Sequence, residues 1–251
     1  MASHTLANAP AADTVLPPAV EASRLCRRYG RRWALIDVSF RVQRGTLLMV
    51  AGRNGSGKST LFRLLATAIR ADHGTARIEG KDVCAERQDV RRRIGLLSHQ
   101  TYLYDSLTAL ENLQVAARFL GADAGRGALL PLLEEVGLAD RADDPPATFS
   151  AGMRKRLSLA RVLLKGAPVI LLDEPYAQLD PPGFRLVDRL LGRLRERGAT
   201  VLIATHLLER AAELCERGML LEQGRLAWSG PAARLAADSG LNSEAMPESA
   251  V

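Results

Sequence analysis

Cysteine, lysine and long apolar runs are all scarce in this sequence of 251 residues. The three cysteines, Cys26, Cys84 and Cys215, are odd in number, far apart and without metal-ligand spacing, which argues against a disulfide framework or a zinc site. We therefore expect reduced thiols in a cytoplasmic protein. The longest apolar stretches, such as 169–172 and 201–204, fall far short of the about 20 residues that a membrane-spanning helix needs.

The composition also lacks the signature of any fibrous or disordered class. Apolar residues make up 47% and charged residues 25% of the chain, close to the globular average, which excludes collagen-like, coiled-coil and fully disordered chains. Residues 1–20 lack the positive start and apolar middle of a secretion signal, and we expect a disordered lead-in there. The apolar pattern fades again at 236–251, an expected flexible tail. One domain is expected between them, over 21–235.

The formal charge is +6, and 30 of the 34 cationic residues are arginines, because only four are lysines. Such an excess is typical of proteins that bind nucleic acid or membrane surfaces. Alanine is abundant as well, as in a chain written from GC-rich codons, and we favour this simpler explanation. No direct nucleic-acid binding is therefore expected.

Short β-like runs separated by amphipathic segments predict an α/β domain. Two strands open it, near 20–28 and 36–42, and the run 46–51 leads through a glycine-rich turn into a helix over 59–70. Further strands are expected at 94–98, 169–172, 201–204, 219–221 and 226–228. Residues 101–165 hold no strand candidate but three helix-like runs, at 109–120, 128–136 and 153–164. They predict a helical insertion within the α/β domain.

The turn after the run 46–51 has the pattern G-x-x-x-x-G-K-[ST] between a strand and a helix. It consists of Gly52, Arg53, Asn54, Gly55, Ser56, Gly57, Lys58 and Ser59, followed by Thr60. Glycines let the backbone turn its N–H groups inward, which makes a nest for phosphate oxygens at a helix N-terminus. We expect Lys58 to bridge the β- and γ-phosphates of a nucleoside triphosphate, Ser59 to ligate Mg²⁺ and Thr60 to donate to a phosphate oxygen.

Two adjacent carboxylates, Asp173 and Glu174, end the strand at 169–172. Strand alternation sends their side chains in different directions, so they can take different roles. We expect Asp173 to share the Mg²⁺ site with Ser59, and Glu174 to orient or deprotonate an attacking water. His206 follows its own apolar strand and is a candidate for contacting the γ-phosphate and positioning that water.

The segment Phe149-Ser150-Ala151-Gly152-Met153 resembles the L-S-G-G-Q signature of ATP-binding cassette (ABC) ATPases. The phosphate loop, this segment, Asp173-Glu174, Leu179-Asp180 and His206 follow one another as in that family, over about residues 21–235. The resemblance implies an ABC-type nucleotide-binding domain of the P-loop NTPase class, with an antiparallel β subdomain and a helical subdomain at about 101–165. It also implies ATP as the nucleotide.

The resemblance extends to contacts between subunits. In that family two subunits clamp the nucleotide head to tail, so Ser150, Ala151, Gly152 and Asp180 would contact ATP held on the partner's phosphate loop. Tyr29 resembles the aromatic residue that stacks on adenine. A core tyrosine at a strand end is the competing interpretation.

Three departures from the family pattern concern its motifs. Ala151 and Met153 replace Gly and Gln of the signature, and Gln178 stands in the segment before Asp180. At the Q-loop, the family's register falls on His99, with Gln100 one residue later, so either could reach Mg²⁺ and the water. We favour Gln100, because an amide oxygen is the better ligand for a hard cation.

The resemblance implies the ATP-hydrolysing subunit of a transporter whose integral membrane permease is a separate chain. We expect a homodimer bound peripherally at the cytoplasmic face of the inner membrane. The segment 98–113 resembles the haem exporter of cytochrome c biogenesis, and other exporter ATPases, of drug, lipid or polysaccharide type, share much of it. A soluble ABC ATPase acting on nucleic acid or ribosomes typically has two cassettes or a coiled-coil insertion. A P-loop kinase or GTPase would have no use for Ser150 or His206.

Overall fold

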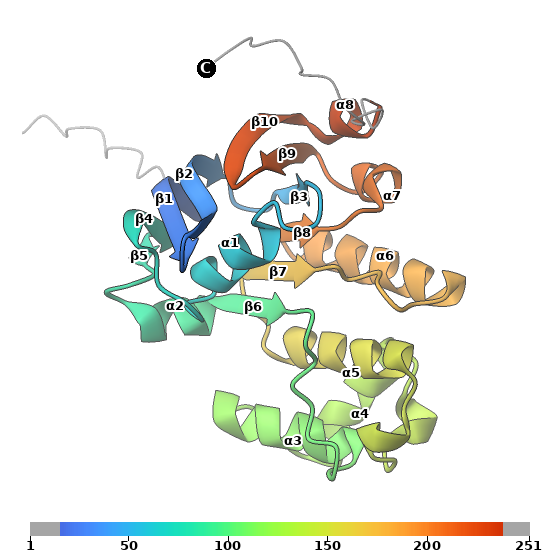
Figure 1. Ribbon diagram of the computed structural model, residues 1–251. Coiled ribbons are helices and arrows are strands. Elements are labelled where there is room, and N and C mark those ends of the chain that lie inside the picture. Colours follow the sequence, from blue (N-terminus) through green and yellow to red (C-terminus); the bar gives the residue numbers. More distant parts are fainter. Residues whose placement is uncertain (1–15, 238–251) are drawn as a thin grey trace, which may run out of the picture.

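The computed structural model describes residues 16–237 of this protein. Within these residues, six strands form the central sheet (Figure 1). Their order is β10-β9-β3-β8-β7-β6, and all neighbours run parallel except β10, which is antiparallel to β9. The strands are β3 (Leu47–Ala51), β6 (Ile94–Leu97), β7 (Val169–Asp173), β8 (Thr200–Ala204), β9 (Arg217–Glu222) and β10 (Arg225–Pro231). The expected runs at 219–221 and 226–228 are the middles of β9 and β10.

The central strands are apolar on both faces because a core lies on each side of the sheet. In β7, Val169 and Leu171 belong to one hydrophobic cluster, whereas Ile170 and Leu172 belong to the other. Two buried faces explain why these strands are uninterrupted apolar runs rather than alternating ones.

A second, antiparallel sheet has the order β2-β1-β4-β5. Its strands are β1 (Val20–Tyr29), β2 (Arg32–Val42), β4 (His73–Ile78) and β5 (Lys81–Asp82). Helix α1 (Lys58–Leu65) shares a hydrophobic cluster with both sheets through Leu61, Phe62, Leu64 and Leu65. The antiparallel β subdomain is confirmed, although β4 and β5 were not predicted.

The prediction that the first helix reaches residue 70 is wrong, because α1 ends at Leu65. Thr67 has a left-handed backbone with φ of 60° and is almost fully buried. Two arginines of α2 (Arg87–Arg93) bind it: Arg87 donates to the Thr67 carbonyl at 2.8 Å and Arg91 to its Oγ1 at 2.8 Å. These contacts turn the chain out of the helical path.

Helices α3 (Ala109–Leu120), α4 (Arg126–Glu135) and α5 (Ala151–Leu164) form the helical insertion, below the β6 edge in Figure 1. Helix α3 has the predicted bounds, since Thr108 and Glu111 make a capping box and Gly121 ends the helix with φ of 68°. Helix α5 begins two residues earlier than predicted.

Helices α6 (Pro181–Glu196), α7 (Leu208–Ala212) and α8 (Ala232–Ala237) complete the domain. Ala19 and Val20 are fully buried and the Glu79 N–H donates to the Ala19 carbonyl at 2.9 Å, so this part of the expected lead-in is folded. Residues 1–15 of the expected lead-in and 238–251 of the expected tail lie outside the described residues. Within 16–237, no helix combines the length and apolarity that crossing a bilayer requires.

Candidate functional site

The predicted site segments follow four neighbouring strands of the central sheet. The phosphate loop follows β3, His206 follows β8, Glu174 ends β7, and His99 and Gln100 follow β6. Ala204 of β8 pairs with Val50 on one side and with Asp173 on the other, so these strands end level. Their carboxyl ends therefore meet at one edge of the sheet, the usual ligand position in open α/β sheets.

Two glycines let the phosphate loop pass close to other backbone. Gly52 and Gly57 have φ of 143° and 111°, which side chains rarely adopt. A Cβ on Gly52 would lie 2.3 Å from the Leu221 carbonyl oxygen, and one on Gly57 would lie 2.5 Å from that of Ala34. The loop is thus fitted against β9 and β2 and leaves no room for larger residues.

Lys58, the first residue of α1, lies under this loop. Its Nζ donates to the Gly52 carbonyl at 2.5 Å and to the Arg53 carbonyl at 3.2 Å. Burial lowers the pKa of Lys58, and the carboxylates of Glu174 and Asp173 oppose that shift. The ammonium group therefore lies within the field of both carboxylates.

The loop fits a polyphosphate. The N–H groups of Lys58, Ser59 and Thr60 begin a helix and so have no intrahelical acceptor. Ser56 Oγ is buried and has no hydrogen-bond partner among the described residues. A cradle of free donors beside a cation is the chemistry that phosphate oxygens require. Arg53, Asn54 and Gly55 are exposed on the loop.

Glu174 leaves the strand in an unusual conformation. Its φ is 50°, uncommon for a residue other than glycine, and its N–H donates to the Ala204 carbonyl at 2.8 Å. Its Oε2 lies 2.9 Å from Nδ1 of His206. The structure thus brings together the two side chains that were expected to position a water.

Asp173 and Ser59 offer oxygen atoms for a metal. The Asp173 side chain is buried at the end of β7 and the Ser59 side chain is exposed on α1. Within residues 16–237, no group of three His, Cys, Asp or Glu side chains could hold a metal ion. A hydroxyl and a carboxylate, completed by phosphate and water, are a donor set that fits Mg²⁺.

Lys155 of α5 was not singled out from the sequence. It is 3% exposed and its Nζ donates to the Asp173 carbonyl at 3.3 Å. Burial lowers the pKa of Lys155, and the carboxylates of Asp173 and Glu174 oppose this shift only in part. The sequence offered one sign of its importance: it is one of only four lysines in an arginine-rich chain and lies five residues after Ser150.

The segment 149–153, which resembles the ABC signature, lies at the start of α5 and not at the sheet edge. Ser150 caps α5, its Oγ accepting from the Met153 N–H at 3.2 Å, and Asp180 caps α6 in the same way, accepting from the Gly183 N–H at 2.9 Å. A Cβ on Gly152 would lie 2.9 Å from the Gln178 carbonyl oxygen. Over the described residues, no hydrogen bond joins 150–152 to the phosphate loop. The two segments are not brought together within one chain.

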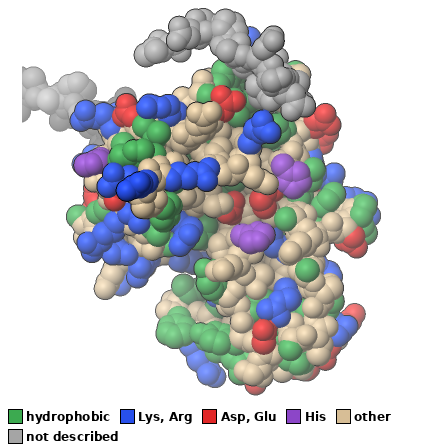
Figure 2. All heavy atoms as spheres, in the orientation of Figure 1, with side chains coloured by type: hydrophobic (Ala, Val, Ile, Leu, Met, Phe, Trp, Pro, Cys, Tyr) green, Lys and Arg blue, Asp and Glu red, His purple; other side chains and the backbone are tan. Residues whose placement is uncertain are grey.

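His99 and Gln100 are both exposed after β6. Ser98 Oγ donates to the Gln100 carbonyl at 2.5 Å. Gln100, but not His99, lines a cavity of about 370 Å³ between β6 and the helical insertion, together with Arg91, Arg161 and Phe119. The surface in Figure 2 is indented between these two parts.

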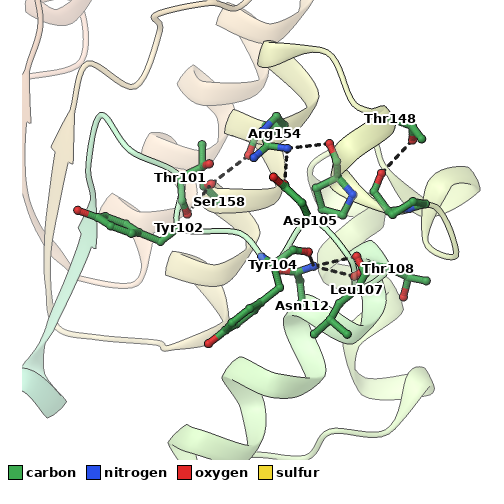
Figure 3. Close-up of polar contacts among 12 residues, drawn as sticks. Thr101, Tyr102, Tyr104, Asp105, Leu107, Thr108, Asn112, Thr148, Arg154 and Ser158 are labelled. Carbon is green, nitrogen blue, oxygen red and sulfur yellow. Dashed lines mark hydrogen bonds and ion pairs between the residues drawn. The ribbon is translucent and has the colours of Figure 1, made fainter.

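The segment 101–108, which follows, is bound to the helical insertion (Figure 3). Asn112 of α3 accepts from the Tyr104 N–H at 2.9 Å and donates to the carbonyls of Tyr104, Leu107 and Thr108 at 3.0, 3.2 and 2.9 Å. Arg154 donates to Asp105 at 2.6 Å. This segment therefore belongs with α3 and α5.

Tyr29 ends β1 and is 43% exposed, so the interpretation as a core tyrosine is wrong. The Arg27 guanidinium lies 4.9 Å from its ring centre. Its cross-strand neighbour Arg32 extends toward the phosphate loop, since a Cβ on Gly55 would lie 3.5 Å from Arg32 Nη2. Figure 2 shows Lys and Arg side chains gathered over the region of β1 and β2.

Comparisons with known proteins agree with this geometry. The model of the family described as ABC transporter matches residues 35–177. The daunorubicin resistance ATP-binding protein DrrA3 of Streptomyces coeruleorubidus is 40% identical, over 85% of this chain and 68% of its own. The Nod factor export ATP-binding protein I of Paraburkholderia xenovorans (strain LB400) is 35% identical, over 88% of this chain and 74% of its own.

Solved structures share the fold. An ATP-binding cassette, solved as a dimer in a post-hydrolysis state with ADP and Pi, is 28% identical with a TM-score of 0.79 over 85% of this chain and 98% of its own. A bacterial Atm1-family ABC exporter with ATP bound is 25% identical with a TM-score of 0.81, over 94% of this chain and 42% of its own.

Proposed function

This chain belongs to the ABC transporter family, as an ATP-hydrolysing subunit, and we propose that it powers export through a separate membrane permease. The observation that carries the proposal is the single sheet edge at which the phosphate loop, Asp173, Glu174 and His206 meet. The drug-resistance and Nod-factor-export names of its relatives support export as the direction.

Each group at this edge would take one role. The loop 52–60 binds the triphosphate of ATP, and Lys58 contacts its β- and γ-phosphates. Ser59 and Asp173 would hold Mg²⁺, which neutralises charge on the phosphate oxygens. Glu174 orients and deprotonates the attacking water, and His206 holds the Glu174 carboxylate in position. Tyr29 stacks on adenine.

A second copy of the chain would complete the site. Ser150 and Gly152 lie at the start of α5, without a hydrogen bond to their own phosphate loop among the described residues, so their donors are free for the nucleotide of a partner. The similar cassette solved as a dimer supports a dimer of this chain. Closure of the dimer around ATP would drive the permease, with the chain held peripherally at the cytoplasmic membrane face.

The permease would dock at the cavity beside Gln100. Exposed aromatic side chains lie at or near it: Tyr102 is 68% exposed, Tyr104 52% and Phe119 85%. Such side chains are typical of interaction surfaces.

Two cargo classes are proposed. The relatives favour a drug or a Nod-factor-like cargo, as their names concern daunorubicin and Nod factor. Haem export for cytochrome c biogenesis rests only on the segment 98–113, and the relatives named above do not support it.

ATP binding is tested on the purified chain. Lys58→Ala should weaken ATP affinity by about 100-fold, since it removes the buried cation of the phosphate loop. Titration with a fluorescent ATP analogue measures this, and circular dichroism checks the fold. Unchanged affinity would contradict the loop assignment.

Deletion of the coding sequence in its host tests the cargo. Loss of membrane c-type cytochromes, restored by the wild-type chain but not by Lys58→Ala, would support haem export. Unchanged cytochromes with increased sensitivity to daunorubicin would support the drug-exporter alternative. A host with neither phenotype would contradict haem export and the export of daunorubicin-like drugs.

A further inference from the structure

Close in sequence to Glu174 and His206 lies a partly buried polar cluster that the proposed mechanism does not use. Tyr176, two residues after Glu174, is 1% exposed, and its hydroxyl donates to Asp188 Oδ1 at 2.9 Å. Arg210, four residues after His206, donates through Nε to Asp188 Oδ1 at 3.2 Å and through Nη2 to Asp188 Oδ2 at 2.5 Å. Asp188 lies on α6 and so joins the two.

Aromatic packing rigidifies this cluster. The rings of Tyr176 and Phe184 meet edge to face at 5.8 Å, and the Arg210 guanidinium lies 5.8 Å and 5.3 Å from their centres. Phe184 and Asp188 are one helical turn apart on α6, so one face of the helix makes all these contacts. A fork of two hydrogen bonds, unlike a single ion pair, also sets the orientation of the guanidinium.

The cluster joins two segments that carry site residues. Glu174 reaches Tyr176 through one turn, in which the Ala177 N–H donates to the Glu174 carbonyl at 3.2 Å. His206 reaches Arg210 through the start of α7, where the Leu207 N–H donates to Thr205 Oγ1 at 3.1 Å. A shift of either segment would alter the 2.9 Å separation of Glu174 Oε2 and His206 Nδ1.

We propose that Tyr176, Asp188 and Arg210 form a clamp of positioning residues that holds Glu174 and His206 in hydrogen-bond contact for ATP hydrolysis. The clamp touches neither nucleotide nor water and acts only through that pair. The carboxylate of Asp188 accepts from both partners, while Tyr176 donates; burial and Asp188 raise the pKa of its phenol, so it stays protonated. The proposal rests on the ATPase function proposed above.

The test compares Tyr176→Phe, which removes one oxygen and keeps the ring, with Arg210→Ala and Arg210→Lys. We expect kcat for ATP hydrolysis to fall about fivefold in Tyr176→Phe and about tenfold in Arg210→Ala, with ATP affinity unchanged. Arg210→Lys should be intermediate, since lysine cannot bind both carboxylate oxygens in a fork. Arg193→Ala is the matched control, because it removes another α6 ion pair, to Glu135 at 2.8 Å.

A second measurement separates positioning from mere stability. The ¹⁵N shifts of His206 in histidine-labelled, nucleotide-free protein report which ring nitrogen carries the proton. The wild type and Arg193→Ala should show the Nδ1–H form that the Glu174 contact selects, and Arg210→Ala and Tyr176→Phe should show less of it.

Two results would overturn the clamp. In one, Tyr176→Phe and Arg210→Ala lose thermal stability but keep kcat and the His206 spectrum. In the other, kcat falls while the His206 spectrum is unchanged, so the effect does not pass through the pair. Failure of the proposed function is distinct from either, because the wild type itself would then not hydrolyse ATP.

Discussion

The sheet edge and the segment 98–108 both carry predicted site residues, but they are held in place by different means. At the edge, backbone holds the residues: strands end level, two glycines leave no room for a Cβ beside neighbouring carbonyls, and the Glu174 N–H donates to the Ala204 carbonyl. In the segment, side chains do so: Asn112 and Arg154 bind its part 101–108, directly after His99 and Gln100. The position of the edge residues is therefore fixed by the sheet, whereas the position of the segment depends on a few side chains.

The chemistry of the edge should depend on one carboxylate. Glu174→Gln keeps the size and an acceptor for His206 but removes the base, so ATP hydrolysis should fall by about 10³-fold while ATP affinity is kept. Phosphate release and nucleotide binding measure the two effects. The exposed Glu209→Gln on α7 is the control. Full turnover by Glu174→Gln would remove this residue from the catalytic role.

The attachment of the segment should depend on Asn112. Asn112→Ala removes four hydrogen bonds, among them the acceptor of the part-buried Tyr104 N–H and a donor to the Leu107 carbonyl, so it should cost about 2–3 kcal/mol of unfolding free energy. Urea denaturation measures this, and limited proteolysis should show earlier cleavage within 101–108. Arg126→Ala, which removes an exposed ion pair to Asp143 in the same insertion, should leave the stability unchanged. Equal effects of the two variants would contradict this account of the segment.

The smallest expected effect is a difference in kcat between Gln100→Ala and His99→Ala. Gln100 lines the cavity beside β6, and Gln100→Ala should lower kcat about tenfold through loss of the side-chain amide as a ligand. His99→Ala should change kcat less than twofold. Steady-state ATPase assays over a range of Mg²⁺ concentrations compare them. A larger loss in His99→Ala would assign the Q-loop role to the histidine.

Local signals made part of this structure predictable. The phosphate loop, the β7 carboxylates and the bounds of α3 each depend on residues close together in the chain, such as Thr108, Glu111 and Gly121. Strand β4 was missed because only Ala76 and Ile78 of its six residues are buried, which gives a weak pattern. Its pairing with β1 supplies what propensity does not.

The ABC transporter family, the nucleotide loop and the paired carboxylates were decided by the sequence alone, because backbone nests and strand ends require particular residues at fixed spacing. Only the tertiary structure decided which groups meet around them. Lys155 lies beside Asp173 across 18 residues, and Arg210 binds Asp188 across 22. Such contacts depend on how α5, α6 and α7 pack against the sheet, and no short-range pattern encodes that packing.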